Sequence, residues 1–148
     1  MPQLEPATED DLALYESAVA IIRARFREGR HHVGAAVRGG SGRIYAGLHL
    51  QAVVGEPAVC AEAIAIGRAM SEGEDRISAS VAVRHPKERE VGGAPRVLPP
   101  CGSCRDLVAD YGGKNAWILL EVDGKLVKTR IHELIPLRRW ARGASPIE

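Results

Sequence analysis

The sequence is short of the features that mark membrane proteins and nucleic-acid-binding proteins. Its 148 residues carry 20 basic and 19 acidic side chains, a formal net charge of +1, whereas binding to a phosphate backbone needs a clustered excess of lysine and arginine. No apolar stretch is long enough to cross a bilayer, and the first residues show neither the basic region nor the apolar run of a signal peptide. We therefore expect no long nucleic acid and no membrane among the partners, and a cytoplasmic location.

Aromatic residues and cysteines are also scarce. Only six residues are phenylalanine, tyrosine or tryptophan, so few side chains are available to stack on a ligand. The three cysteines are an odd number, and Cys101 and Cys104 enclose just two residues. This pattern argues against a disulfide framework and for reduced thiols with a chemical role, of which metal binding is the first to test.

The length and the composition fit one domain. A chain of 148 residues with 45% hydrophobic residues can build a single hydrophobic core but not two comfortable ones. We therefore expect a single domain over residues 1–148, with flexible ends at 1–7 and 141–148.

The hydrophobic pattern predicts alternating helices and strands. After Thr8, a good N-cap, apolar residues such as Leu12, Val19 and Ile22 recur at helical steps, whereas the segments around the glycine-rich run 39–42 read as a hairpin. We expect helices at 8–29, 58–70 and 101–111, strands at 33–37, 43–50, 77–83, 117–122 and 126–131, a long loop at 85–100, and a short helical piece at 132–140. This order predicts an α/β fold with helices on both faces of a mixed sheet and a site at strand ends and helix N-termini.

Three cysteines and one glutamate fall at two of the predicted helix starts. Cys60 lies in the first turn of one helix, and Cys101 and Cys104 lie in the first turn of another. Helix N-termini stabilise thiolates, and a catalytic zinc site uses three protein ligands and keeps the fourth position for water. Glu62, two residues after Cys60, can reach that water without binding the metal, which is the place for a proton shuttle.

Two motifs carry a resemblance to a known family. Cys60-Ala61-Glu62 and Pro100-Cys101-Gly102-Ser103-Cys104 match the signature of zinc-dependent deaminases. From about residue 33 to residue 136 the chain resembles the cytidine deaminase superfamily, with further matches at 33–36, 42–47 and 133–136. The resemblance implies a three-layer α/β/α sandwich around a mixed five-stranded sheet, and a homo-oligomer, either a tetramer or a dimer. It also implies one zinc ion per subunit, held by Cys60, Cys101 and Cys104.

The activity that this resemblance implies is hydrolytic deamination of a small amino-heterocycle, similar to cytidine, cytosine or blasticidin S. Zinc would lower the pKa of its bound water, and the hydroxide would attack the ring carbon that carries the amino group. Glu62 would carry the protons until ammonia leaves. Backbone groups near Ala61 and Pro99 would hold the ring and the leaving group.

Several positions depart from the pattern of nucleoside-specific cytidine deaminases. His49 and Gln51 stand where those enzymes carry an Asn and a Glu that bind ribose, so they are candidate substrate-binding residues that argue against plain cytidine. Ala63 replaces an arginine that offsets the thiolate charge, which leaves this role to helix N-termini and Arg105. Trp140 follows the C-terminal motif much as a Trp does in blasticidin-S deaminases, and is a candidate for stacking on the base. A structural His49 and a Trp140 packed at a subunit interface are the alternatives.

Other functions stay open at this point. A closed zinc site with four protein ligands, His85 being the fourth, would indicate a non-catalytic binding or assembly module stabilised by zinc. A non-nucleoside substrate such as guanine or an aminotriazine would keep the same chemistry. Editing of bases within nucleic acids fits the near-neutral net charge poorly.

Overall fold

The computed structural model of the chain describes all residues except 91, 139 and 141–148. Its helices are α1 (Glu9–Arg25), α2 (Ala61–Ser71) and α3 (Gly102–Gly112), with 3-10 turns η1 (Glu88–Glu90) and η2 (Ile131–Leu134). Its strands are β1 (Glu5–Pro6), β2 (Val33–Gly39), β3 (Ile44–Leu48), β4 (Ile77–Arg84), β5 (Arg96–Leu98), β6 (Trp117–Val122) and β7 (Lys125–Arg130). All three helices and all five strands that the sequence predicts are present.

The strands form one mixed sheet in the order β1-β7-β6-β4-β2-β3, with β5 pairing to β4. β4 and β6 run parallel, and the other pairs are antiparallel. The sheet has two strands more than the predicted five, namely β1 and β5. They are only two and three residues long. Segments this short carry no readable alternation of apolar and polar residues, so the prediction of an uninterrupted loop over 85–100 was wrong where η1 and β5 interrupt it.

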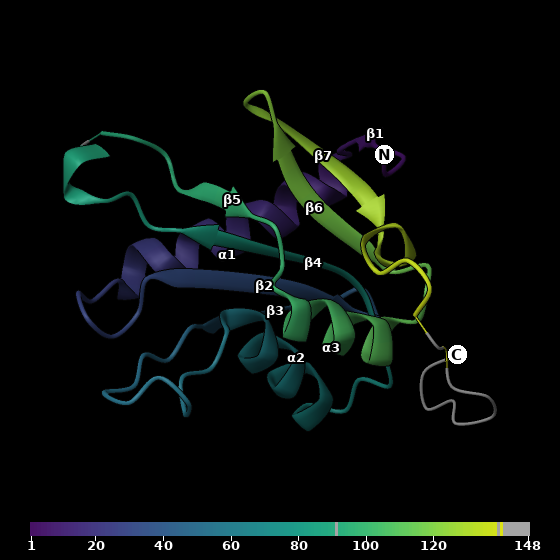
Figure 1. Cartoon of the computed structure of the whole chain (residues 1–148), viewed down its shortest axis with the longest axis horizontal. Coiled ribbons are helices and arrows are strands. Elements are labelled where there is room, and N and C mark those ends of the chain that lie inside the picture. Colours follow the sequence, from purple (N-terminus) through teal and green to yellow (C-terminus); the bar gives the residue numbers. More distant parts are fainter. Residues whose placement is uncertain (91, 139, 141–148) are drawn as a thin grey trace.

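The helices cover both faces of the sheet, as predicted (Figure 1). α1 packs on one face, where Leu14, Ala18 and Ile22 are fully buried against residues of β2, β4 and β6. α2 and α3 lie side by side on the opposite face and share a second core cluster. The molecule is therefore a three-layer α/β/α sandwich.

The start of α1 follows the predicted capping chemistry, and its buried stripe includes the predicted Val19 and Ile22 but not Leu12. Thr8 caps the helix through a capping box with Asp11. Leu12, expected to face the core, is 47% exposed, whereas Leu14 is fully buried. The buried face of α1 also contains Leu14 and the small Ala18, because alanine lets the helix approach the sheet closely. The positions of the larger apolar side chains alone do not show that this face of the helix is the buried one.

Two features tie the first residues of the chain to the sheet, although the sequence predicted a flexible end at 1–7. β1 pairs with β7, and the Thr129 hydroxyl donates a hydrogen bond to the Gln3 carbonyl at 2.7 Å. Nearby, the Lys128 ammonium lies 2.8 Å from a carboxylate oxygen of Asp11, and both side chains are about 10% exposed or less. The predicted flexible end at 141–148 lies outside the described residues. Within the described part of the chain, no helix is long and apolar enough to cross a membrane.

Candidate metal centre

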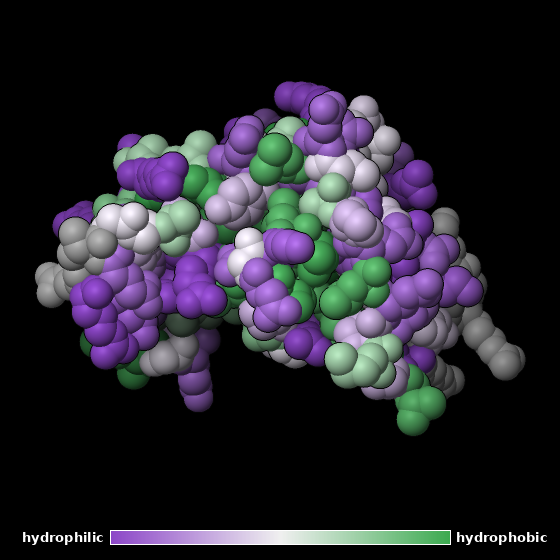
Figure 2. Space-filling model, turned by 90° about the horizontal axis from the view of Figure 1, so that it is seen from above, coloured by the Kyte–Doolittle hydropathy of each residue, from purple (hydrophilic) through white to green (hydrophobic). Residues whose placement is uncertain are grey.

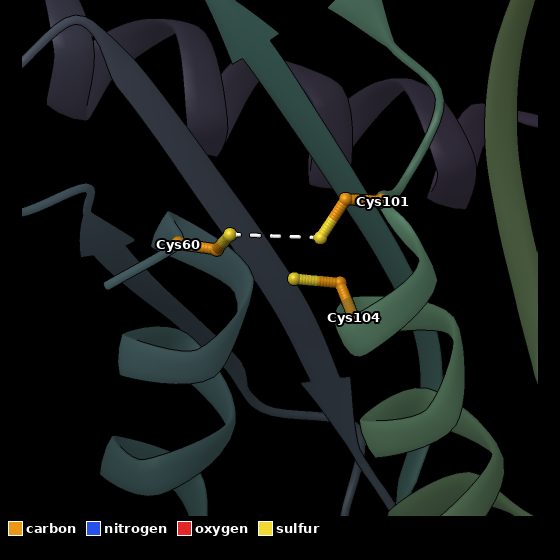
Figure 3. Close-up of side chains that lie close together, drawn as sticks. All are labelled: Cys60, Cys101 and Cys104. Atoms are coloured by element: carbon orange, nitrogen blue, oxygen red, sulfur yellow. Dashed lines mark hydrogen bonds between the residues drawn. The ribbon is translucent and has the colours of Figure 1, made fainter. Parts of the chain in front are cut away.

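The N-termini of α2 and α3 lie next to each other, and each begins at a cysteine. Cys60 is the N-cap of α2 and Cys101 is the N-cap of α3, both with extended backbone, and neither side chain caps its own helix. Cys104 lies in the first turn of α3 and is buried. Figure 3 shows the three sulfur atoms pointing toward one another between the two helices. The predicted placement of the cysteines at helix starts is confirmed.

The spacing of the sulfur atoms fits zinc. The Sγ atoms of Cys60 and Cys101 are 3.7 Å apart, and all three Sγ atoms lie within 4.8 Å of one another. Zinc–sulfur bonds of about 2.3 Å place the corners of a regular tetrahedron about 3.8 Å apart. The cluster can therefore bind one zinc ion through three sulfur atoms and leave the fourth corner to a non-protein ligand.

No histidine of the described residues joins this cluster. His85, the candidate fourth ligand, instead stacks on Phe26 with ring centroids 3.7 Å apart, and its Nδ1 atom is 2.9 Å from the Pro86 carbonyl. The closed site that would favour a non-catalytic zinc module is therefore not formed by these residues.

The three thiols do not ionise equally easily without a metal. Burial, followed by the negative charge of Glu62, raises the pKa of Cys104 above its usual range, and burial also raises the pKa of Cys60. Burial acts in the same direction on Cys101, but hydrogen bonds from the backbone N–H and the thiol of Cys104 lower its pKa below the ordinary value. A bound cation therefore has to supply the stabilisation that deprotonates all three thiols.

Glu62 occupies the first turn of α2 and is 6% exposed. Burial raises the pKa of this carboxyl group above its usual range, although its own backbone N–H and the thiol of Cys104 act in the opposite direction. It lines the same cavity as Cys60 and Cys101. A carboxyl group beside a metal site whose pKa is raised by burial is suited to take up a proton and to release it again.

The cavity at this centre measures about 150 Å³ and contains part of the predicted substrate site. Its wall includes His49, Ala61 and Pro99, three of the five predicted substrate-binding residues. Val33, Ala82 and Leu98 contribute further apolar side chains to the wall. Sequence reasoning missed these three, since only the pairing of β2, β4 and β5 brings them together.

Gln51 does not line this cavity, but it contacts a residue that does. The backbone N–H of His32 donates to His49 Nδ1 at 3.0 Å, so His49 carries its proton on Nε2 and donates to Gln51 Oε1, also at 3.0 Å. In addition, the ring of His31 donates from Nδ1 to the His49 carbonyl at 2.9 Å. Gln51 therefore lies behind His49 and helps to orient its ring.

Trp140 also lies away from the cavity lining. Its ring packs against the core cluster beneath α2 and α3, with the Arg138 guanidinium 4.6 Å above it. Arg138 in turn pairs with Asp106 at 3.2 Å and with Asp110, both exposed on α3. Within one chain, Trp140 thus packs beside α3 and does not reach the reacting end of the cavity.

Arg105 anchors the segment that carries Cys101. Its guanidinium donates from Nε to the Pro100 carbonyl at 2.9 Å and from Nη1 to the Leu134 carbonyl at 3.1 Å. The predicted role as a counter-charge for the thiolates stays a prediction, but these two bonds position the turn before α3.

Comparisons with known proteins agree with this geometry. The family model described as "Cytidine and deoxycytidylate deaminase zinc-binding region" matches residues 8–120. The blasticidin-S deaminase of Bacillus cereus is 47% identical over 131 residues, which cover 88% of this chain and 93% of that protein. The cytidine deaminase of Halalkalibacterium halodurans is 29% identical over 108 residues, covering 72% and 76% of the two chains. Among solved structures, the cytidine deaminase from Mycobacterium tuberculosis superposes with a TM-score of 0.70 at 25% identity, covering 90% of this chain and 100% of that one.

Proposed function

Because this chain belongs to the cytidine and deoxycytidylate deaminase zinc-binding family, we propose that Cys60, Cys101 and Cys104 hold its zinc ion and that Glu62 is its proton shuttle. The chain is a zinc-dependent aminohydrolase that acts on a cyclic amidine. The observation that carries the residue assignment is a cluster of three cysteine sulfur atoms, two of whose cysteines, Cys60 and Cys101, line one cavity with the buried carboxyl group of Glu62. We propose one zinc ion per subunit.

The side chains divide the work of hydrolysis among them. Zinc, when bound, supplies a Lewis acid that makes water nucleophilic at neutral pH. Glu62 accepts the proton that water loses as its oxygen bonds to the ring carbon, and passes it to the ring nitrogen. It then takes up the second proton of that oxygen and delivers it to the amino group, so that the carbon–nitrogen bond breaks and ammonia leaves. A carboxyl group whose pKa burial raises suits both directions of transfer.

The cavity suits a single ring. Its volume of about 150 Å³ lies below the roughly 300 Å³ at which sites for drug-sized ligands begin, so the rest of a larger substrate has to extend outside. The apolar side chains of Val33, Ala82 and Leu98 exclude bulk water around the ring, while backbone groups at Ala61 and Pro99 are available to hold it. We propose that these residues and His49 form the substrate site.

The substrate that we propose is a cytosine compound related to blasticidin S rather than plain cytidine. The relative that is 47% identical over most of this chain is a blasticidin-S deaminase, and His49 with Gln51 replaces the pair expected for ribose. Hydrogen bonds that His49 makes to its neighbours use both ring nitrogens, so the His49 ring offers no free acceptor to a ribose diol. Guanine and an aminotriazine are the alternative substrates.

We also propose a cytoplasmic homo-oligomer, a dimer or a tetramer, built from one domain per chain. Three cysteines that form no disulfide support a cytoplasmic location, because free thiols persist in a reducing compartment. Trp140 packs away from its own cavity, so a contact between Trp140 and substrate would have to come from a neighbouring subunit.

Ammonia release by the zinc-loaded protein tests this assignment. Wild type is assayed with cytosine, cytidine, deoxycytidine, blasticidin S, guanine and an aminotriazine, and blasticidin S is expected to give the highest kcat/KM. Glu62→Ala should retain zinc and lose about 100-fold to 10,000-fold in rate. Glu72→Gln is the matched control, since this exposed carboxylate at the end of α2 pairs with Arg68. Turnover by Glu62→Ala at the control's rate would exclude the proton-shuttle role, and efficient turnover of cytidine would exclude the proposed specificity.

A further inference from the structure

A second and much larger hollow lies beside the catalytic cavity, and the deamination chemistry does not use it. It measures about 1160 Å³, against about 150 Å³ for the cavity. Its walls come from the end of α1, the start of β2, the end of β4 and the excursion that follows β4. In Figure 1 this region lies at the left, between α1 and the turn that precedes β5. We call it the excursion groove.

The excursion groove and the catalytic cavity are neighbours. His32 lines the groove and the next residue, Val33, lines the cavity. Val33 is also paired across the sheet with Arg84, which lines the groove. The ring of His49, in the cavity wall, is 5.7 Å from the ring of His32. Residues 32, 33 and 49 therefore lie at the boundary between the cavity and the groove.

The groove has a flat aromatic surface. The rings of Phe26 and His85 stack with centroids 3.7 Å apart and an angle of 10° between their planes. His32 meets Phe26 edge-on at 5.7 Å. Phe26 contributes the apolar part of this surface, against which the uncharged part of a ligand can lie.

The rim of the groove carries an excess of positive charge. The described side chains that line it include four basic residues, Arg23, Arg84, Lys87 and Arg89, and one acidic residue, Glu28. Arg84 is paired with Glu90 at 3.1 Å, while the described residues offer no ion pair to Arg23, Lys87 or Arg89. Figure 2 shows that hydrophilic side chains gather at this end of the molecule, beside the grey atoms at the left. Clustered charge of one sign in a hollow concentrates ligands of the opposite sign.

We propose that the excursion groove binds the part of the substrate that projects from the reacting ring, and that this part carries an anionic group, a carboxylate or a phosphate. This inference rests on the proposed function, because it takes the ring to occupy the catalytic cavity. The cavity selects the ring by size, and the groove selects its substituent by charge. The groove is thus a specificity site outside the metal centre.

Three cytosine compounds distinguish the possible anions. Cytosine is the neutral probe, cytidine 5′-monophosphate carries a phosphate, and a cytosine with a carboxyalkyl chain on N1 carries a carboxylate. For wild type we expect kcat/KM for at least one anionic probe to exceed that for cytosine, and the preferred probe identifies the anion. Raising the salt concentration should reduce this preference, because exposed charges are screened. Equal kcat/KM for all three probes at low salt would overturn the proposal.

Two arginines on α1 provide a matched pair of variants. Arg23 lines the groove, whereas Arg25 is exposed on the same helix and does not. We expect Arg23→Gln to reduce the preference for the anionic probe over cytosine by roughly threefold to tenfold, mainly through KM, as befits an exposed charge pair. Arg89→Gln should act in the same direction, and Arg25→Gln should leave the preference unchanged. If Arg23→Gln and Arg25→Gln behave alike, the groove does not bind the anion.

Direct binding separates this inference from the proposed function. Calorimetric titration of the carboxyalkyl cytosine and the nucleotide into zinc-loaded wild type, Arg23→Gln and Arg25→Gln needs no turnover. Weaker binding in Arg23→Gln alone, without ammonia release from any probe, would support the groove and refute the deaminase assignment. Ammonia release with identical dissociation constants in both variants would support the deaminase assignment and refute the groove.

Discussion

Gly47 of β3 controls how closely α2, which carries Cys60 and Glu62, can approach the sheet. A Cβ atom added at Gly47 would lie 2.7 Å from the backbone nitrogen of Ala65 and 3.1 Å from its Cα, whereas ordinary contacts are 3.4–4 Å. The obstacle is helix backbone, which cannot rotate away as a side chain can. Gly47→Ala therefore has to move α2 from β3 by about 0.7 Å or more, by the difference between these contacts.

A shift of this size changes the metal centre more than the fold. Cys60 moves with α2, while Cys101 and Cys104 stay with α3, so the 3.7 Å distance between the sulfur atoms of Cys60 and Cys101 changes. Misplacement of reacting groups by about 1 Å can cost about 100-fold in rate. We expect Gly47→Ala to lose roughly tenfold to 100-fold in kcat/KM by this reasoning, to bind zinc more weakly, and to lose about 1–3 kcal/mol of stability to overpacking.

Three measurements check this prediction: competition with a chromogenic zinc chelator, ammonia release and thermal unfolding. Gly67→Ala is the control, because it lies within the same helix and an added Cβ there meets nothing within 4 Å. That variant should keep its zinc and gain about 0.5–1 kcal/mol of stability, since alanine loses less backbone entropy than glycine in a helix. Wild-type zinc affinity and kcat/KM in Gly47→Ala would refute the reasoning.

Three further predictions concern charged side chains. Asp11→Asn leaves the Lys128 ammonium buried without its partner and should lower the free energy of unfolding in urea by about 3 kcal/mol. The double variant Asp11→Asn with Lys128→Met should recover most of the lost stability. Equal losses in the single and the double variant would contradict the prediction. Burial tends to raise the pKa of Asp11, but the hydrogen bond from Lys128 holds it below the ordinary value. The contribution of Asp11 is therefore complete above the unfolded-state pKa of about 3.9 and is lost as the pH falls through the lower folded-state pKa, so Asp11→Asn should flatten the acid limb of unfolding free energy against pH. Arg105→Met frees the Pro100 carbonyl and should weaken zinc binding about tenfold, with partial rescue by Arg105→Lys. Unchanged zinc retention in Arg105→Met would contradict both the positioning role and the counter-charge role of Arg105.

The sequence by itself determined the chemistry of the metal centre. Cys60, Glu62, Cys101 and Cys104 all belong to the first turns of helices, and a turn is a local structure that four or five consecutive residues define. The order of helices and strands was equally readable, because burial on one face imposes a period on each segment long enough to show it. For these features, the residues that determine the local structure are close together in the sequence as well as in space.

The tertiary structure alone decided the surroundings of that centre. The apolar wall of the cavity forms where β2, β4 and β5 pair, and β5 is too short to leave a pattern of its own. Gln51 lies behind His49, and Trp140 packs beside α3 instead of over the cavity. Such contacts join segments that are far apart in the sequence, and their free energy depends on which surfaces the sheet brings together, so no local period of residues encodes them.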